Sequence, residues 1–166
     1  MNSENPLVGV MMGSTSDGDV MRGCITILRE LGIPYEVKVI SAHRTPELTR
    51  DYALSARGRG IHVLIAGAGW AAHLAGALAA HTTLPVIGVP IDSSPLKGFD
   101  ALLSTVQMPP GIPVATMAVG SGGAKNAAVL AAQILALKFP AVADRLERYR
   151  EELSRQVREK ADSWVD

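Results

Sequence analysis

Apolar and polar positions follow two different periods along the chain. Short apolar runs rich in β-branched residues predict strands at residues 7–12, 35–40, 61–66, 85–90 and 113–119. Between them, apolar side chains recur every three or four residues and predict helices at 20–31, 46–57, 71–80, 124–137 and 142–164, with a brief helix or turn at 98–106. This alternation is typical of an α/β fold with three layers. We therefore expect a doubly wound parallel sheet of flavodoxin-like order 2-1-3-4-5, in a single domain over residues 1–166.

The two C-terminal helices carry more apolar surface than such a sheet would cover. The pattern at 124–137 is apolar nearly all the way round, so that helix must be buried on several sides. The last helix has a single apolar stripe between Arg and Glu residues, formed by Val142, Leu146, Tyr149, Leu153 and Val157. We expect this C-terminal helix to pack on neighbouring subunits of a homo-oligomer.

Composition restricts the class of partner. Sixteen basic residues balance sixteen acidic ones, so the net charge is zero and neither nucleic acid nor a membrane surface is favoured over a small metabolite. The only cysteine, Cys24, falls in a helical pattern and is expected to be a buried thiol in a reducing compartment. The polar N-terminus shows no signal peptide and no apolar run is long enough to span a bilayer, so we expect a cytoplasmic protein.

The candidate chemistry lies in three loops that follow the first three strands. In the order 2-1-3, these loops meet at the carboxyl edge of the sheet, where ligands bind. The loop at 41–46 offers His43, whose imidazole can give or take a proton, and Arg44, whose guanidinium matches phosphate or carboxylate. The plainer interpretation is a helix-capping His43 and a solvated Arg44.

The other two loops add polar and glycine residues. Ser14, Ser16 and Asp17 suit a phosphate and a ribose diol, although Ser16 or Asp17 also predicts a helix N-cap. Residues 67–69 predict a glycine-rich turn into a helix that carries His73 in its first turn. The turn lacks the dinucleotide fingerprint and the P-loop lysine, and the four histidines show no metal-ligand spacing. The residues thus indicate a phosphorylated ribose metabolite, acid–base chemistry at a histidine, and no metal.

Five segments, taken in order, resemble successive signatures of the PurE family of purine biosynthesis. These segments are residues 13–17, 41–46, 66–74, 84–90 and 106–116. The resemblance implies a flavodoxin-like octamer with active sites at subunit contacts and no metal or organic cofactor. It also implies an isomerase that moves the carboxylate of N5-carboxyaminoimidazole ribonucleotide from the exocyclic nitrogen to carbon four of the ring, giving 4-carboxy-5-aminoimidazole ribonucleotide.

The resemblance also assigns roles to individual residues. His43 corresponds to the general acid and base, while Ser14, Asp17 and Arg44 correspond to substrate contacts. The expected pocket wall consists of Ser16, Ser41, Gly67, Ala68, Gly69, His73 and Leu74. Two residues depart from the family pattern, since Trp70 stands where glycine is usual and Ala75 where proline is usual. An inward-pointing Trp70 would reshape the pocket.

Three alternatives remain open at this point. A sister class of the family carboxylates aminoimidazole ribonucleotide with carbon dioxide, but it carries Lys-Gly where this chain has Arg44 and Thr45. A PurE-like enzyme that carboxylates another nucleotide, such as a pyridinium carboxylase, would keep the fold and His43. A noncatalytic nucleotide sensor or receiver-like module would not need His43, and a receiver would show clustered acids at its strand ends.

Overall fold

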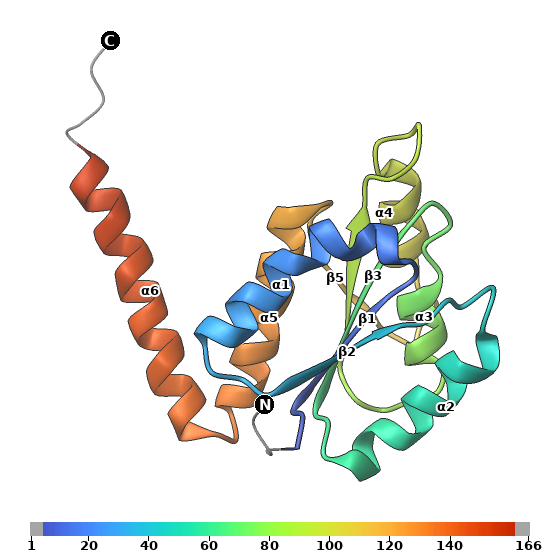
Figure 1. Cartoon of the computed structure of the whole chain (residues 1–166), viewed down its shortest axis with the longest axis horizontal. Helices are drawn as coiled ribbons and strands as arrows, with labels where there is room; N and C mark the ends of the chain where they lie inside the picture. Colours follow the sequence, from blue (N-terminus) through green and yellow to red (C-terminus); the bar gives the residue numbers. More distant parts are fainter. Residues whose placement is uncertain (1–4, 162–166) are drawn as a thin grey trace.

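A computed structural model describes residues 5–161 and shows a five-stranded, all-parallel sheet (Figure 1). The strands are β1 (Val8–Met12), β2 (Tyr35–Val39), β3 (Val63–Gly69), β4 (Val86–Ile91) and β5 (Ala115–Thr116). Their order is β2-β1-β3-β4-β5, which confirms the predicted flavodoxin-like topology. The loops after β1, β2, β3 and β4 consequently share one edge of the sheet.

Helices cover both faces of the sheet. One face carries α1 (Gly18–Glu30) and α5 (Ser121–Ala136), and the other carries α2 (Pro46–Ala56), α3 (Leu74–Ala79) and α4 (Phe99–Val106). The last helix, α6 (Pro140–Ala161), packs on α5 and then projects away from the sheet (Figure 1). Two 3-10 turns, η1 (Thr15–Asp17) and η2 (Arg57–Arg59), precede α1 and follow α2.

Small side chains allow α5 to lie close to α1 and to the sheet. The buried face of α5 is formed almost entirely by glycine and alanine, namely Gly123, Ala124, Ala127, Ala128, Ala131, Ala132 and, as the one larger residue, Leu135. The partner face of α1 includes Cys24, whose burial raises the pKa of its thiol to about 12. The thiol is therefore a neutral core group, as the sequence predicted.

Strands β2, β3 and β5 differ from the sequence-based expectation. The glycine-rich segment 67–69 is not a turn, because β3 continues to Gly69 and pairs there with Ile91 of β4. Strand β5 has only two residues, since the chain beyond it follows β4 through isolated hydrogen bonds such as Met117 N–H to Gly88 O. Strand β2 was predicted over residues 35–40 but ends at Val39; it is the sheet edge and leaves Val39 51% exposed.

The C-terminal helices are largely as predicted but leave apolar surface uncovered. Helix α5 begins at Ser121 rather than 124 and buries one face rather than several. Helix α6 contains the predicted stripe and buries only Val142 fully; residues 162–164 of the predicted helix lie outside the described residues. Within residues 5–161, no helix combines the length and the apolar character needed to cross a membrane.

Candidate active site

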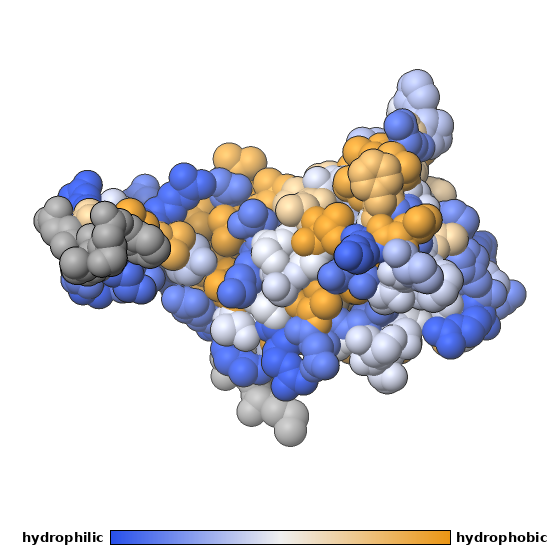
Figure 2. Space-filling model, turned by 90° about the horizontal axis from the view of Figure 1, so that it is seen from above, coloured by the Kyte–Doolittle hydropathy of each residue, from blue (hydrophilic) through white to orange (hydrophobic). Residues whose placement is uncertain are grey.

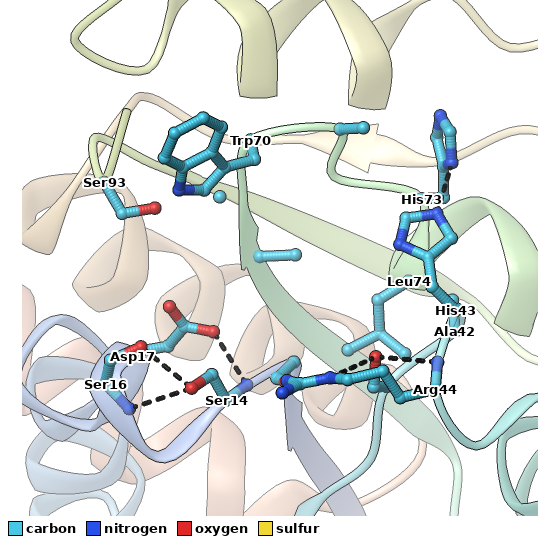
Figure 3. Close-up of a pocket in the computed structure, with 15 residues that line it drawn as sticks. Ser14, Ser16, Asp17, Ala42, His43, Arg44, Trp70, His73, Leu74 and Ser93 are labelled. Atoms are coloured by element: carbon cyan, nitrogen blue, oxygen red, sulfur yellow. Dashed lines mark hydrogen bonds between the residues drawn. The ribbon is translucent and has the colours of Figure 1, made fainter. Parts of the chain in front are cut away.

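A cavity of about 530 Å³ opens at the carboxyl edge of the sheet, where the loops after β1, β2, β3 and β4 meet (Figure 3). Ten of the eleven residues that the sequence singled out line it: Ser14, Ser16, Asp17, Ser41, His43, Arg44, Ala68, Gly69, His73 and Leu74. The exception is Gly67, which lies one residue deeper in β3. A Cβ atom there would approach the Sδ atom of Met21 to 2.4 Å, so the glycine is explained by packing of α1 on the sheet.

The first loop is held by a capping box at the start of η1. Ser14 is the N-cap of η1; its Oγ accepts the Ser16 N–H at 3.3 Å, while the Ser14 N–H donates to Asp17 Oδ2 at 3.0 Å. Asp17, one of the two predicted caps, is the N-cap residue of α1, although its side chain makes no capping hydrogen bond there. Asp17 is only 5% exposed. Removal from water raises the pKa of the Asp17 carboxyl, although the Ser14 N–H and the nearby Arg44 charge oppose that rise. The capping box thus presents hydroxyls and a carboxyl side by side at the cavity.

The second loop is closed by Thr45 and tied to the first by Arg44. Thr45 Oγ1 accepts the Ser41 N–H at 3.0 Å and donates to the Ser41 carbonyl at 3.0 Å, which fixes the turn ahead of Pro46. The Arg44 guanidinium donates to the carbonyl of Gly13 at 2.8 Å and to Ser41 Oγ at 3.4 Å. Arg44 therefore bridges the loops after β1 and β2 and places a fixed positive charge at the floor of the cavity (Figure 3).

The imidazoles of His43 and His73 meet at the rim of the cavity, across from Trp70 (Figure 3). Nε2 of His43 lies 2.8 Å from Nδ1 of His73, and the rings are edge-on with centroids 4.9 Å apart. One of these two nitrogens must donate and the other accept, so one proton lies in this contact. His73 was expected inside the first helical turn, but it is the N-cap residue of α3. Both imidazoles are therefore carried by loops that lead from a strand into a helix.

The remaining lining residues are ones that sequence reasoning missed or left open. Ser93, which follows β4, lies so close to β3 that a Cβ on Gly69 would come within 1.8 Å of its Oγ atom. Its position could have been found from the strand order, because the end of β4 shares an edge with the end of β3. Gly13, Ala42, Trp70 and Ala71 also line the cavity, and the Trp70 side chain is 59% exposed.

The site contains hydroxyls, a carboxyl, a guanidinium and two imidazoles, but among residues 5–161 no three His, Cys, Asp or Glu side chains lie close enough together to hold a metal ion. The arrangement combines anion-binding and ribose-binding groups with a proton carrier in one cavity. Such a cavity suits acid–base chemistry on a phosphorylated sugar compound.

Comparison with known proteins points in the same direction. Residues 7–156 match the family described as AIR carboxylase. The chain is 58% identical to the N5-carboxyaminoimidazole ribonucleotide mutase of Pyrococcus horikoshii, over 97% of this chain and 90% of that one. It is 56% identical to the mutase of Bacillus subtilis, over 96% and 99% of the two chains. A crystal structure of Treponema denticola PurE superposes with a TM-score of 0.82 at 30% identity, covering 97% of this chain and 99% of that one.

Proposed function

The chain belongs to the AIR carboxylase family, and we propose that its cavity converts N5-carboxyaminoimidazole ribonucleotide to 4-carboxy-5-aminoimidazole ribonucleotide in purine biosynthesis. This is an isomerisation, in which a carboxylate leaves the exocyclic nitrogen and is attached to carbon four of the same ring. The relatives at 52–59% identity carry the name of this mutase over nearly the full chain.

The reaction requires one proton carrier and a cavity that retains carbon dioxide. Breaking the nitrogen–carboxylate bond releases carbon dioxide, and one proton then completes the amine of aminoimidazole ribonucleotide. Attack of carbon four on the carbon dioxide forms the new carbon–carboxylate bond, and carbon four loses its proton. The proton taken up in the first half is returned in the second, so a single imidazole suffices.

His43 is the proposed carrier. It stands beside Arg44 on the same loop, and its Nε2 atom is within hydrogen-bond reach of His73. The proposal rests on this juxtaposition of a proton-carrying ring with an anion-binding residue in one cavity. His73 positions the His43 ring by occupying one of its nitrogens.

The substrate is proposed to lie along the cavity with its phosphate and ribose on the Arg44 side. Ser14, Ser16 and Asp17 provide hydroxyl and carboxyl partners there, and Ser41 holds the Arg44 backbone through a bond of 3.2 Å to its N–H. Ala68, Gly69 and Leu74 form the wall under the ring. We also propose that the chain forms one domain and works in the cytoplasm, as its sequence pattern and composition indicate, and that it assembles as an octamer, as the family resemblance implies.

Incubation of the purified protein with each candidate nucleotide tests the proposal. Formation of 4-carboxy-5-aminoimidazole ribonucleotide is followed by absorbance, starting from N5-carboxyaminoimidazole ribonucleotide in one arm and from aminoimidazole ribonucleotide with bicarbonate in the other. We expect efficient turnover in the first arm at low bicarbonate. Efficient turnover only in the second arm would identify the sister carboxylase, and none in either would contradict the proposal.

A further inference from the structure

Trp70 adopts a backbone conformation that is unfavourable for a large side chain. Its φ angle is +53°, and among the described residues only one other non-glycine residue, Lys97, has a positive φ. A bulky residue in this left-handed region is an outlier that persists only where the surroundings impose it. The turn follows immediately after Gly69, which is pressed against Ser93 at the end of β3.

Core packing does not explain this strained conformation. The Trp70 side chain is 59% exposed, so little apolar burial offsets the unfavourable backbone. Backbone strain of this kind concentrates at ligand-binding positions. Trp70 lines the cavity, and Figure 3 shows its indole at the rim.

The Trp70 indole lies across the cavity from the two imidazoles. Figure 3 shows Trp70 beside Ser93 on one rim of the cavity, across the hollow from His43, with Asp17 and Arg44 along its floor. Among the residues 5–161 that line the cavity, the two imidazoles are the only other rings, and they are engaged with one another. Trp70 is therefore the one wall residue that offers a broad, flat, apolar face opposite the proton carrier.

We propose that Trp70 stacks on the aminoimidazole ring of the substrate and covers the space in which carbon dioxide waits between the two halves of the reaction. This inference rests on the proposed function and adds a specificity-determining residue to it. An uncharged molecule such as carbon dioxide gains little from hydrogen bonds, so its retention depends on closing the cavity around it. A stacked indole holds the ring in register and blocks the open side at the same time.

Fluorescence tests whether the indole contacts the ring. The sequence has two tryptophans, so the full-length Trp164→Phe variant carries Trp70 as its only one. Titration with 4-carboxy-5-aminoimidazole ribonucleotide should quench or shift its emission, with a midpoint that matches the inhibition constant of this product. Ribose 5-phosphate, which lacks the ring, is the matched probe and should leave the emission unchanged. Unchanged emission with both ligands, while the nucleotide still inhibits, would overturn the contact.

Three variants separate stacking from simple bulk. Trp70→Gly should raise KM roughly tenfold to a hundredfold, the usual effect of losing a ring-stacking partner, and should release more aminoimidazole ribonucleotide per turnover than wild type. Trp70→Phe should restore most of both losses, whereas Trp70→Leu keeps bulk without a π-face and should not restore KM. Because glycine relieves the positive φ, we expect the melting temperature of Trp70→Gly to be unchanged or higher, so a kinetic loss would not reflect unfolding.

The outcomes distinguish this inference from the proposed function. If wild type isomerises the substrate but Trp70→Gly has the same KM and releases no extra aminoimidazole ribonucleotide, the role of Trp70 is wrong and the function stands. Recovery of KM by leucine as full as by phenylalanine would contradict stacking. A wild-type protein inert toward the nucleotide would overturn the proposed function itself, and this inference with it.

Discussion

Arg44 combines two tasks that are difficult to separate in one side chain. Its guanidinium reaches the Gly13 carbonyl and Ser41 Oγ at once, so it ties two loops together while its charge faces the cavity. A guanidinium offers five donors in a fixed fork, whereas an ammonium is a compact point charge. The geometry of the site therefore depends on the shape of this group as well as on its charge.

Arg44→Lys is accordingly predicted to impair binding although the charge is retained. Loss of the fork removes charge-assisted hydrogen bonds worth about 1.5–3 kcal/mol each, so KM should rise about tenfold or more with a smaller effect on kcat. Steady-state kinetics measure the split between the two constants. Asp17→Ala tests the first loop in the same assay, and unchanged kinetics for both variants would show that these two loops do not bind the substrate.

His43 is predicted to be required for turnover and not for binding. His43→Asn retains a hydrogen-bonding side chain but cannot carry a proton near pH 7, so kcat should fall by about two to four orders of magnitude while affinity survives. Calorimetry with the product and absorbance-based turnover measure the two properties separately. His73→Asn is the control and should lose less, because an amide still occupies the facing nitrogen of His43.

Turnover of His43→Asn within tenfold of wild type would identify His73 as the carrier instead.

At the residue scale, the sequence was informative where loops carried reactive groups after recognisable strands, as at His43 and Asp17. It did not reveal that Nε2 of His43 and Nδ1 of His73 lie 2.8 Å apart, because these residues are 30 positions apart in the sequence and only the folded sheet brings their loops together. Ser93 was missed because its loop carries no distinctive motif.

At the scale of the elements, small residues allow α5 to pack closely against its neighbours. Gly122 and Gly123 are neighbours in its first turn but differ sharply in their surroundings. A Cβ on Gly123 would lie 1.7 Å from the carbonyl oxygen of Ala118, whereas a Cβ on Gly122 would meet nothing within 4 Å. The start of α5 therefore lies against the segment that precedes it, and only one of the two glycines is required there.

Alanine at these two positions provides a matched test of that contact. Gly123→Ala must displace backbone, so we expect it to lower the free energy of unfolding by about 1–3 kcal/mol. Gly122→Ala should be neutral or stabilise the fold by up to about 1 kcal/mol, since alanine is the better helix former. Urea unfolding of the two variants gives the difference, and equal stabilities would show that α5 does not start in this contact.

The types and the order of the helices and strands could be predicted from the periodicity of the sequence, but the residues at which several of them end could not. Strand β3 extends to Gly69 because hydrogen bonds to β4 override the low strand preference of glycine. The edge position of β2 follows from the predicted order 2-1-3-4-5, and the alternation of Glu36 and Lys38 with apolar residues suits a strand that is covered on one face. Tertiary pairing decided where β3 ends, and tertiary pairing is not encoded in a local window.

At the scale of the whole molecule, two of the exposed apolar surfaces of residues 5–161 lie on helices near the C-terminal half of the chain. One lies on and before α4 and includes Leu96 and Phe99, which are 64% and 63% exposed. The other is the outer half of the α6 stripe, where Leu153 is 45% and Val157 71% exposed. Figure 2 shows apolar side chains gathered on the surface over the region of α4 and alongside α6. Patches of this kind are typical of subunit contacts.

The α6 stripe provides the sharpest test of the proposed assembly. Val142 anchors the start of α6 to the core, and Arg145 donates to the Leu31 carbonyl at 2.6 Å, so deleting the whole helix would also damage the protomer. Leu153→Glu combined with Val157→Glu alters only the exposed half. We expect this double variant to keep its helical circular dichroism while its mass, measured by light scattering, falls below that of the wild-type assembly.

The control and the wild type decide what such a result means. Glu151→Gln lies on the opposite side of α6 from Leu153, two residues away on a helix with 3.6 residues per turn, and should leave the mass unchanged. A wild-type protein that is monomeric at micromolar concentration would contradict the proposed oligomer outright. If the double variant assembled like wild type, the subunit contact would not involve the α6 stripe, and the exposed surface around α4 would be the remaining place for it.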